Sequence, residues 1–444
     1  MRFSFTRTTA LLLATLALAP NWPAQAAGAT LSFVEAQRLA AARSLQLVAH
    51  DASITSSREM AVAAGQLPDP VLRGGIDNLP IEGSDRFNLS RDFMTMRRIG
   101  VMQEFTRADK RQLRAARFER EADRAAAEKN ATLAAIQKDT ATAWLETFYL
   151  ERLREAVAQQ AAEIRREIQA AEAAYRGGRT SQGDVLLAES SRVMLEDRLS
   201  ELERRIKNAR TMLARWIGPE SAGAQLIDEP QLEAVPVHAH DLEAQLQRHP
   251  DITALSQEIA VMETEVSLAR ANKRADWTWE LAYQQRGSAF SDMVSVSVSI
   301  PLQWDQKNRQ DREVASKLAM AERARAQRDE MLRQHLAEVQ TMLSEWENGR
   351  ERLDRYRRQL VPLARQRTEA LVSAYRGGKS DLAAVMAARR NEIEVRAQAL
   401  QLETGIARVW AQLRFLYPEE YVGSADRSTT RVHNAASING GEIK

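Results

Sequence analysis

The chain has 444 residues, of which 44% are apolar, 27% charged and only 6% aromatic. Its 62 Lys and Arg stand against 60 Asp and Glu, and Arg2 and Arg7 near the N-terminus account for the whole excess. The remaining chain is formally neutral, which argues against a nucleic-acid binder, because such proteins carry a basic surplus. The apolar content is too high for a disordered chain, and the lack of Cys excludes disulfides, a thiol nucleophile and a lipidated Cys.

Residues 1–26 are typical of a secretory signal peptide. Arg2 and Arg7 precede an apolar run at 11–18, and Ala24-Gln25-Ala26 supplies a small-x-small cleavage site. A membrane anchor is the less favoured interpretation, because the run is far shorter than the roughly 20 apolar residues that span a bilayer as a helix. We therefore expect an exported protein that does not cross a membrane as an apolar helix.

Long stretches without Pro or Gly predict unusually long helices. Neither residue occurs in 101–176, which leaves room for a helix of about 70 residues, on the order of 100 Å long. Apolar residues recur there at the steps of three and four that a helix requires: Leu145, Tyr149, Leu153, Val157, Ala161, Ile164, Ile168, Ala171 and Tyr175. A second series has coiled-coil spacing: Leu195, Leu199, Leu202, Ile206, Ala209, Leu213 and Trp216.

The chain repeats itself at an offset of 200 residues. Ala174-Tyr175-Arg176-Gly177-Gly178 recurs as Ala374-Tyr375-Arg376-Gly377-Gly378. The same offset superimposes apolar heptad positions, placing Leu199 on Ala399, Leu202 on Leu402, Ile206 on Ile406, Ala209 on Val409, Leu213 on Leu413 and Trp216 on Leu416. A shared pentapeptide alone has little weight in an Ala-rich chain, but these positions in register favour a duplication.

Each Tyr-Arg-Gly-Gly segment is typical of a reversal between two helices. Glycine can adopt the left-handed conformation that ends a helix, and a hydroxyl residue then caps the next one. In the first copy Ser181 and Asp184 have capping-box spacing, whereas in the second copy Ser380 is the predicted cap, without an acid three residues on. Two helical hairpins are therefore expected.

Apolar and polar residues alternate upstream of each long helix, which is the period of a strand. The clearest cases are 277–283 and 294–300, joined by a polar loop, and 71–76 and 99–105 are weaker counterparts in the first half. About four strands per chain are expected. Four strands cannot close a barrel and an open sheet leaves exposed edges, so oligomerisation is the predicted means of closure.

Several segments resemble one known family. They are the double Tyr-Arg-Gly-Gly turn, the opening Leu31-Ser32-Phe33-Val34-Glu35-Ala36, His249-Pro250-Asp251-Ile252, and Val298-Ser299-Ile300-Pro301-Leu302 followed by Lys307-Asn308-Arg309. Over about residues 31–417 the chain resembles the outer-membrane factor (TolC-like) family of efflux channels. The resemblance implies a mainly α fold with a small β part. Long helices, two hairpins per chain, would form an α-barrel, and four strands per chain would join a trimeric, 12-stranded transmembrane β-barrel.

The resemblance also implies a location and partners. The expected protein is a homotrimer in the outer membrane of a Gram-negative bacterium, in contact with membrane lipid and carrying a long periplasmic extension. It would be the passive exit duct of a tripartite system, working with a periplasmic adaptor protein and a proton-driven inner-membrane efflux pump. No nucleic-acid partner is expected.

The expected organisation follows the repeat. Residues 1–26 form the signal peptide, and 27–218 a first structural repeat of helix, β-hairpin and long helical hairpin. A linker at 219–238 leads to a second structural repeat at 239–417. In 418–444, Gly, Ser, Thr and Asn replace the heptads, so a disordered tail is predicted.

The resemblance places the closed end and the adaptor-docking surface at the hairpin tips. The candidate residues are Tyr175, Arg176, Gly177, Gly178, Arg179, Asp184, Tyr375, Arg376, Gly377, Gly378, Lys379 and Asp381. Asp184 matches the family's acidic residue on the first hairpin, and a role as a helix cap is compatible with gating. The second hairpin departs from the family, because Ala384 and Ala387 stand where relatives carry inward-facing acids.

No catalytic, cofactor-binding or metal site is predicted. His238-Ala239-His240 with Asp241 has residue types that chelate metals, but two imidazoles in a linker are more often surface residues. Met94-Thr95-Met96, with Met102, suits copper, but Met near a strand hairpin more often packs or faces lipid. No Ser/His/Asp set, phosphate-binding loop or dinucleotide signature is present, so nothing supports an enzyme.

The cargo is predicted from a few loop residues. Asn78-Leu79-Pro80 with Met94 and Gln103 is similar to the copper/silver or cobalt/zinc/cadmium members of the family, which implies heavy-metal cations. The alternatives are a drug or organic-compound channel and a type I secretion duct. From another class, an exported coiled-coil scaffold or adhesin would explain the helices but not the strand hairpins. A periplasmic adaptor usually has one hairpin flanked by β-domains, whereas two hairpins are expected here.

Overall fold

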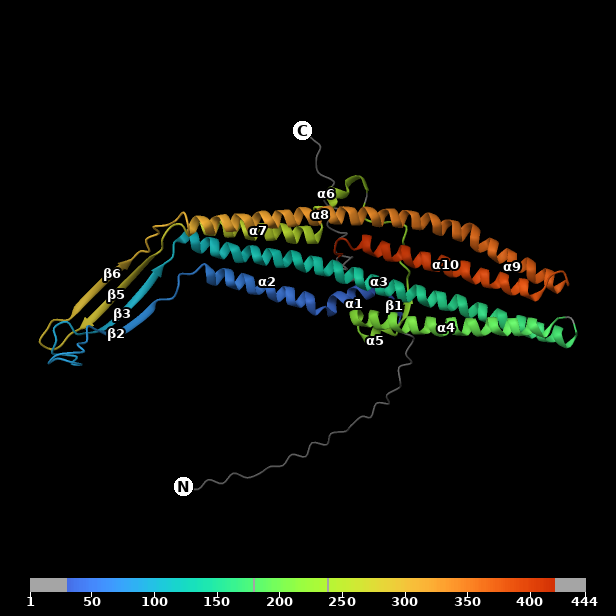
Figure 1. The fold of residues 1–444 in the computed structure, drawn as a ribbon, viewed down its shortest axis with the longest axis horizontal. Helices are drawn as coiled ribbons and strands as arrows, with labels where there is room; N and C mark the ends of the chain where they lie inside the picture. Colours follow the sequence, from blue (N-terminus) through green and yellow to red (C-terminus); the bar gives the residue numbers. More distant parts are fainter. Residues whose placement is uncertain (1–29, 179, 238, 420–444) are drawn as a thin grey trace, which may run out of the picture.

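The computed structural model describes residues 30–178, 180–237 and 239–419. The predicted signal peptide, Arg179, His238 and most of the predicted tail lie outside the described residues. The molecule is elongated, with a four-stranded sheet at one end and the turns of two helical hairpins at the other (Figure 1). Between them lies a region of short helices and the two-stranded sheet of β1 and β4.

The two halves of the chain have a similar order of elements. The first half contains β1 Thr30–Ser32, α1 Phe33–Arg43, α2 Leu45–Ala64, β2 Val71–Asp77, β3 Met96–Phe105, α3 Ala108–Arg176 and α4 Gln182–Ile217. The joining segment contains α5 Pro219–Ala222, β4 Gln225–Ile227, the 3-10 turn η1 Ala239–Asp241 and α6 Leu242–Leu246. The second half contains α7 Pro250–Ala271, β5 Trp277–Gln285, β6 Met293–Ser299, α8 Gln310–Arg355, the π-helical turn η2 Tyr356–Leu360, α9 Val361–Arg376 and α10 Leu382–Arg414.

The predicted long helix is confirmed as α3, which has 69 residues and is therefore about 100 Å long. The apolar positions predicted to line one face, from Leu145 to Ala171, are buried, but Tyr175 at the tip is 47% exposed. In α4, Leu195, Leu202 and Leu213 of the predicted heptads are buried against the same seam. Within the described part of the chain, no helix combines the length and apolarity needed to cross a membrane.

The second long helix is interrupted where α8 passes into α9. The π-helical turn η2 ends two residues before Pro362, which lacks an N–H and crowds the carbonyl four residues earlier. In Figure 1, α9 slopes away from the line of α8 toward α10. Further back, a Cβ on Gly349 of α8 would lie 2.8 Å from Ile406 Cγ1 of α10, so the two helices approach closely there.

The strand predictions are confirmed. In the four-stranded sheet the strand order is β2-β3-β5-β6, and every neighbouring pair is antiparallel. The central pair, β3 and β5, joins the two halves of the chain. In register, Val101 pairs with Leu281 and Phe105 with Trp277.

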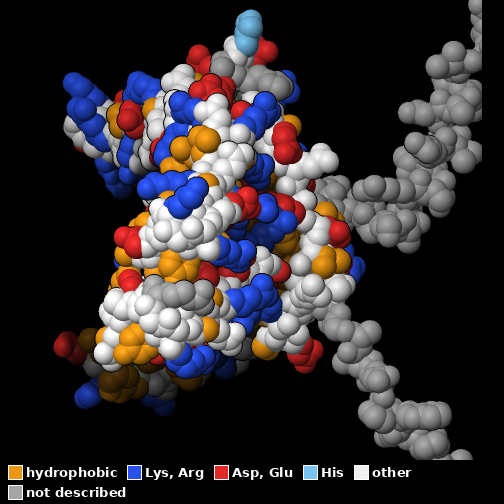
Figure 2. Space-filling view, turned by 90° about the vertical axis from the view of Figure 1, so that its right-hand side faces the viewer, with side chains coloured by type: hydrophobic (Ala, Val, Ile, Leu, Met, Phe, Trp, Pro, Cys, Tyr) orange, Lys and Arg blue, Asp and Glu red, His pale blue; other side chains and the backbone are white. Residues whose placement is uncertain are grey.

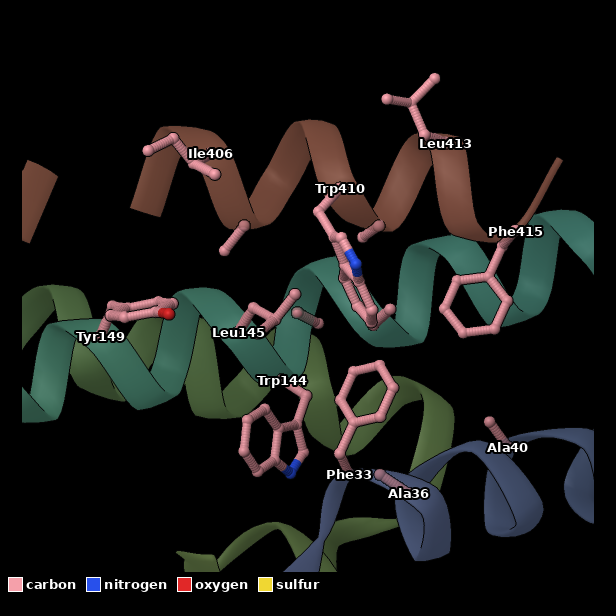
Figure 3. Packing of buried hydrophobic residues seen from close by; sticks show 14 of the residues in the cluster. Phe33, Ala36, Ala40, Trp144, Leu145, Tyr149, Ile406, Trp410, Leu413 and Phe415 are labelled. Atoms are coloured by element: carbon pink, nitrogen blue, oxygen red, sulfur yellow. The ribbon is translucent and has the colours of Figure 1, made fainter. Parts of the chain in front are cut away.

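The two halves are also held together in the middle by an aromatic cluster (Figure 3). The Phe33 ring at the start of α1 lies 5.5 Å from Trp144 of α3 and 5.8 Å from Trp410 of α10, measured between ring centroids. Trp410 Nε1 donates a hydrogen bond of 2.9 Å to the Ala234 carbonyl in the joining segment. The segment predicted as a linker also contributes β4, which pairs in parallel with β1.

Candidate functional site

One face of the four-stranded sheet is apolar, and the other described residues leave it exposed. On β5, Trp277, Trp279, Leu281 and Tyr283 alternate with Thr278, Glu280 and Ala282 and are 49%, 44%, 57% and 44% exposed. The register places further exposed apolar side chains beside them on the same face: Leu72, Ile76, Ile99, Val101, Phe105, Val294, Val296 and Val298. Exposed apolar patches of this extent mark a surface that contacts another apolar phase.

The opposite face of the sheet is polar. Arg98 forms ion pairs with Glu280 and, at 3.7 Å, with Asp77, and Arg73 Nη1 lies 3.6 Å from Glu280 Oε2. Serines alternate along β6 on this face. An apolar face and a charged face on one thin sheet indicate two different environments on its two sides.

Among the described residues, no strand pairs with the outer edge of β2 or of β6. The order β2-β3-β5-β6 with antiparallel neighbours makes β2 and β6 run in opposite directions. The free edge of β6 in one chain can therefore pair with β2 of another chain and continue the same antiparallel pattern. Repetition of that pairing closes a barrel with an even number of strands.

The first hairpin tip turns as the sequence predicts. Gly178 has φ +68°, and its N–H donates to the Tyr175 carbonyl at 2.9 Å. Ser181 and Asp184 form the predicted capping box, and Thr180 Oγ1 donates to Asp184 Oδ2 at 2.7 Å. These hydroxyl hydrogen bonds, first that of Thr180, hold the pKa of Asp184 below its usual value.

The second hairpin tip has the same turn but a different cap. Gly378 has φ +69°, and the Lys379 N–H donates to the Ala374 carbonyl at 2.8 Å, which completes a Schellman closure. The prediction that Ser380 caps α10 is wrong. Asp381 is the N-cap, and its Oδ1 accepts a 2.7 Å hydrogen bond from the Ala384 N–H. Asp381 occupies the position of Ser181 plus 200, so the repeat holds at this residue.

The described tip residues lie together at one end of the molecule. Figure 2 views that end and shows many Lys and Arg side chains with fewer acidic ones between them. Arg176, Arg376 and Lys379 are exposed, and within the described residues no carboxylate lies within 4.0 Å of them. Tyr175 is exposed, whereas Tyr375 packs partly against the cluster between the hairpins. Arg179 is outside the described residues.

A charge cluster behind the tips links the two hairpins and was not predicted. Arg389 of α10 lies 2.7 Å from Glu163 and 3.0 Å from Glu167, both on α3. Glu392, which is 2% exposed, lies 2.8 Å from Arg396 and 3.5 Å from Arg389. Burial raises the pKa of Glu167 above its usual value, and the Arg389 charge opposes that shift.

The two metal-binding patterns considered from sequence are not assembled as single sites by the described residues. His240 is 97% exposed at its side chain, with Nδ1 3.4 Å from Asp241 Oδ1, and His238 lies outside the described part. Met96 and Met102 lie six residues apart on β3, which separates them by about 20 Å at 3.3 Å per residue. Thr95 is buried and its hydroxyl donates to the Asn78 carbonyl.

No family model and no curated protein sequence matches the chain. The outer-membrane channel OprN matches with a TM-score of 0.73 and 17% identity, over 87% of this chain and 90% of that chain. The chain has the fold of the outer-membrane factor channels.

Other channels match over similar spans. The Campylobacter jejuni CmeC outer membrane channel has a TM-score of 0.73 and 11% identity, over 92% of this chain and 90% of that chain. The Vibrio cholerae outer membrane protein VceC has a TM-score of 0.67 and 19% identity, over 85% of this chain and 96% of that chain. The predicted fold class, mainly α with long helical hairpins and a small β part, is confirmed. OprN and CmeC are described as outer-membrane channels, and VceC as an outer membrane protein.

Proposed function

We propose that this protein is one subunit of a homotrimeric outer-membrane channel, the passive exit duct of a tripartite efflux system. The observation that carries the proposal is the sheet: one face is apolar and exposed, the other is charged, and the open edges run in opposite directions. Lipid would cover the apolar face, and the charged face would line water. Three chains would give the 12 strands that the family resemblance implies.

The helical part of the proposed duct extends away from the membrane. Helix α3 alone is about 100 Å long, and both hairpin tips lie at the end opposite the sheet (Figure 1). The tips would therefore lie deep in the periplasm, where a periplasmic adaptor and a proton-driven inner-membrane pump would meet them. The exposed cations Arg176, Arg376 and Lys379 favour acidic groups on the docking partner.

We propose that the ion pairs of Arg389 with Glu163 and Glu167 hold the duct closed by tying the second hairpin to α3, while Glu392, three residues from Arg389 on α10, holds the Arg389 side chain in place. Asp184 contributes by fixing the first tip through its capping box. Opening would separate these pairs, and the cost of separating partly buried charges keeps the resting duct shut.

The membrane assignment is tested by placing one charge on either face of the sheet. Leu281→Arg puts a cation on the apolar face, which costs about 2–4 kcal/mol near the middle of a membrane barrel, so outer-membrane insertion should fall sharply. The matched control is Ser297→Arg on the polar face, which should insert and form a trimer by mass measurement in mild detergent. Equal insertion of both variants, or a monodisperse monomer of the native protein, would overturn the assignment.

The proposed cargo is heavy-metal cations, supported by Asn78 and Met94 in the loop between β2 and β3 and Gln103 on β3, which are similar to metal-efflux members. Deleting the gene and measuring growth across copper, silver, cobalt, zinc, cadmium and organic antibiotics tests the cargo. The expected result is sensitivity to metals that complementation reverses. Sensitivity confined to organic compounds would replace metal cations by drugs while leaving the channel proposal intact.

A further inference from the structure

Two histidines and one aspartate cluster where α7 begins against the middle of α8, far from the sheet and from the tips (Figure 1). His249 is the N-cap of α7, Asp251 lies in the first turn of the same helix, and His335 projects from α8. One ligand atom from each lies within 4.8 Å of the other two. Sequence reasoning did not connect them, because 86 residues separate the two histidines.

The distances in this cluster are close to those of a metal site. Tetrahedral zinc with bonds of about 2.0–2.2 Å holds its ligand atoms roughly 3.3–3.6 Å apart. Asp251 Oδ2 lies 3.5 Å from His335 Nε2 and 3.7 Å from His249 Nδ1. Only the distance between the ligand nitrogens of the two imidazoles has to shorten, and rotation of the side chains can shorten it.

Burial makes the arrangement costly without a further partner. The side chains of His249 and His335 are 10% and 15% exposed, and their ring centroids lie 4.4 Å apart. His335 Nε2 is shielded from solvent, and among the described residues it makes no hydrogen bond of good geometry, although Asp251 Oδ2 lies 3.5 Å away. A buried nitrogen without a hydrogen bond is destabilising, so an occupant that accepts its lone pair would stabilise the packing of α7 on α8.

The surroundings supply an orienting group and space for a fourth ligand. Glu338 Oε2 lies 3.5 Å from His335 Nδ1, so it favours the proton on Nδ1 and leaves the Nε2 lone pair toward Asp251. A cavity of about 650 Å³ lies beside the cluster and is lined by Lys138, Glu338 and Glu345 among others. The carboxylates outnumber the one lysine, which favours a cation, and the cavity admits a water ligand.

We propose that His249, Asp251 and His335 bind one divalent transition-metal ion, with Zn²⁺ as the best fit to two imidazoles and a carboxylate. Imidazole and carboxylate ligands suit zinc in tetrahedral sites. The ion would clamp the start of α7 onto α8.

A purely structural role explains only part of the cluster. His249 Nδ1 accepts a 3.3 Å hydrogen bond from the Asp251 N–H, so His249 serves as a helix cap when no metal is bound. Capping requires neither His335 nor Glu338. Metal binding at Nδ1 would replace this long hydrogen bond.

The test is zinc binding by the tag-free, full-length protein in detergent, first stripped with a chelator. Equilibrium dialysis against micromolar Zn²⁺ should give one tightly bound ion per chain. His335→Gln and Asp251→Asn should each remove that ion, and Glu338→Gln should weaken binding by about 10–100-fold. Co²⁺ in place of Zn²⁺ should give the intense visible absorption of a tetrahedral site, and His335→Gln should abolish it.

The control is His240→Gln, because the His240 side chain is 97% exposed and is not part of the cluster. This variant should keep the tightly bound ion. Absence of tight zinc, or zinc that survives His335→Gln and Asp251→Asn in proteins that still assemble, would overturn the proposal. The inference does not depend on the channel proposal, since the stoichiometry is measured without transport.

Discussion

The two glycines of the second tip have opposite backbone requirements, which makes a matched pair of substitutions. Gly378 has φ +69°, and a Cβ added there would meet nothing within 4 Å, so any penalty comes from the backbone alone. The left-handed region costs a non-glycine residue roughly 1–2 kcal/mol. Gly377 has φ −81°, and its Cβ would make only ordinary contacts, the nearest at 3.5 Å with the Ser373 carbonyl oxygen.

Gly378→Ala should therefore destabilise the hydrogen-bonded turn by about 1 kcal/mol. The fraction of molecules in which this turn is transiently unfolded should rise roughly fivefold. Gly378→Val should cost more because it is β-branched, and Gly378→Asn less because Asn tolerates this region. Gly377→Ala should leave the turn unchanged or slightly more stable, since it only restricts the unfolded chain.

Hydrogen exchange read by mass spectrometry of peptides covering 370–390 measures this opening in the detergent-solubilised protein. Exchange should increase in the order Asn, Ala, Val at position 378, while insertion and assembly stay normal. The Gly378→Val protein should also fail to complement efflux, because its tip no longer fits the adaptor. Equal exchange in Gly377→Ala and Gly378→Ala, or unchanged exchange in Gly378→Val, would refute this account of the turn.

Three further outcomes are expected. Gly100→Val should block sheet formation and outer-membrane insertion, because a Cβ at Gly100 would lie 2.8 Å from Ala282 Cβ. Gly75→Val, whose Cβ would meet nothing within 4 Å, should insert normally when both are measured by membrane fractionation. The lowered pKa of Asp184 means that its cap is fully present above the unfolded carboxyl pKa, about 3.9, and is lost as pH falls through the lower folded value. Exchange protection of the first turn of α4, corrected for intrinsic rates, should fall only in that acid range and should show no such step in Asp184→Asn. Glu392→Gln removes the carboxylate between Arg389 and Arg396, and the loss of this buried partner should cost about 3 kcal/mol and raise single-channel conductance at rest. A conductance equal to that of the native protein would show that this cluster does not hold the duct closed.

Local patterns were sufficient to predict most of the fold. Strands at 277–283 and 294–300 follow from strict alternation, and the turns at Gly178 and Gly378 follow from the need for positive φ. The Ser380 prediction failed because two adjacent residues could both cap, although the repeat offset indicated Asp381.

Contacts between distant segments had no comparable signal. Arg389 and Glu167 are 222 residues apart, and each is one of many charges on long helices, so no spacing indicates which side chains face each other. The π-helical turn before Pro362 likewise depends on how the helix resolves the missing N–H, although Pro362 itself was visible in the sequence. The histidine cluster requires the packing of α7 on α8, which only the fold provides.

The duplication has a consequence for symmetry. Each half of the chain supplies two strands of the four-stranded sheet and one helical hairpin, so three chains would present six tips with only threefold equivalence. One kind of tip carries the reciprocal Ser181 and Asp184 box, and the other carries the single cap Asp381. Around the ring the two kinds would alternate. A partner present in six copies would have to adopt two binding modes, whereas a partner present in three could select one kind of tip.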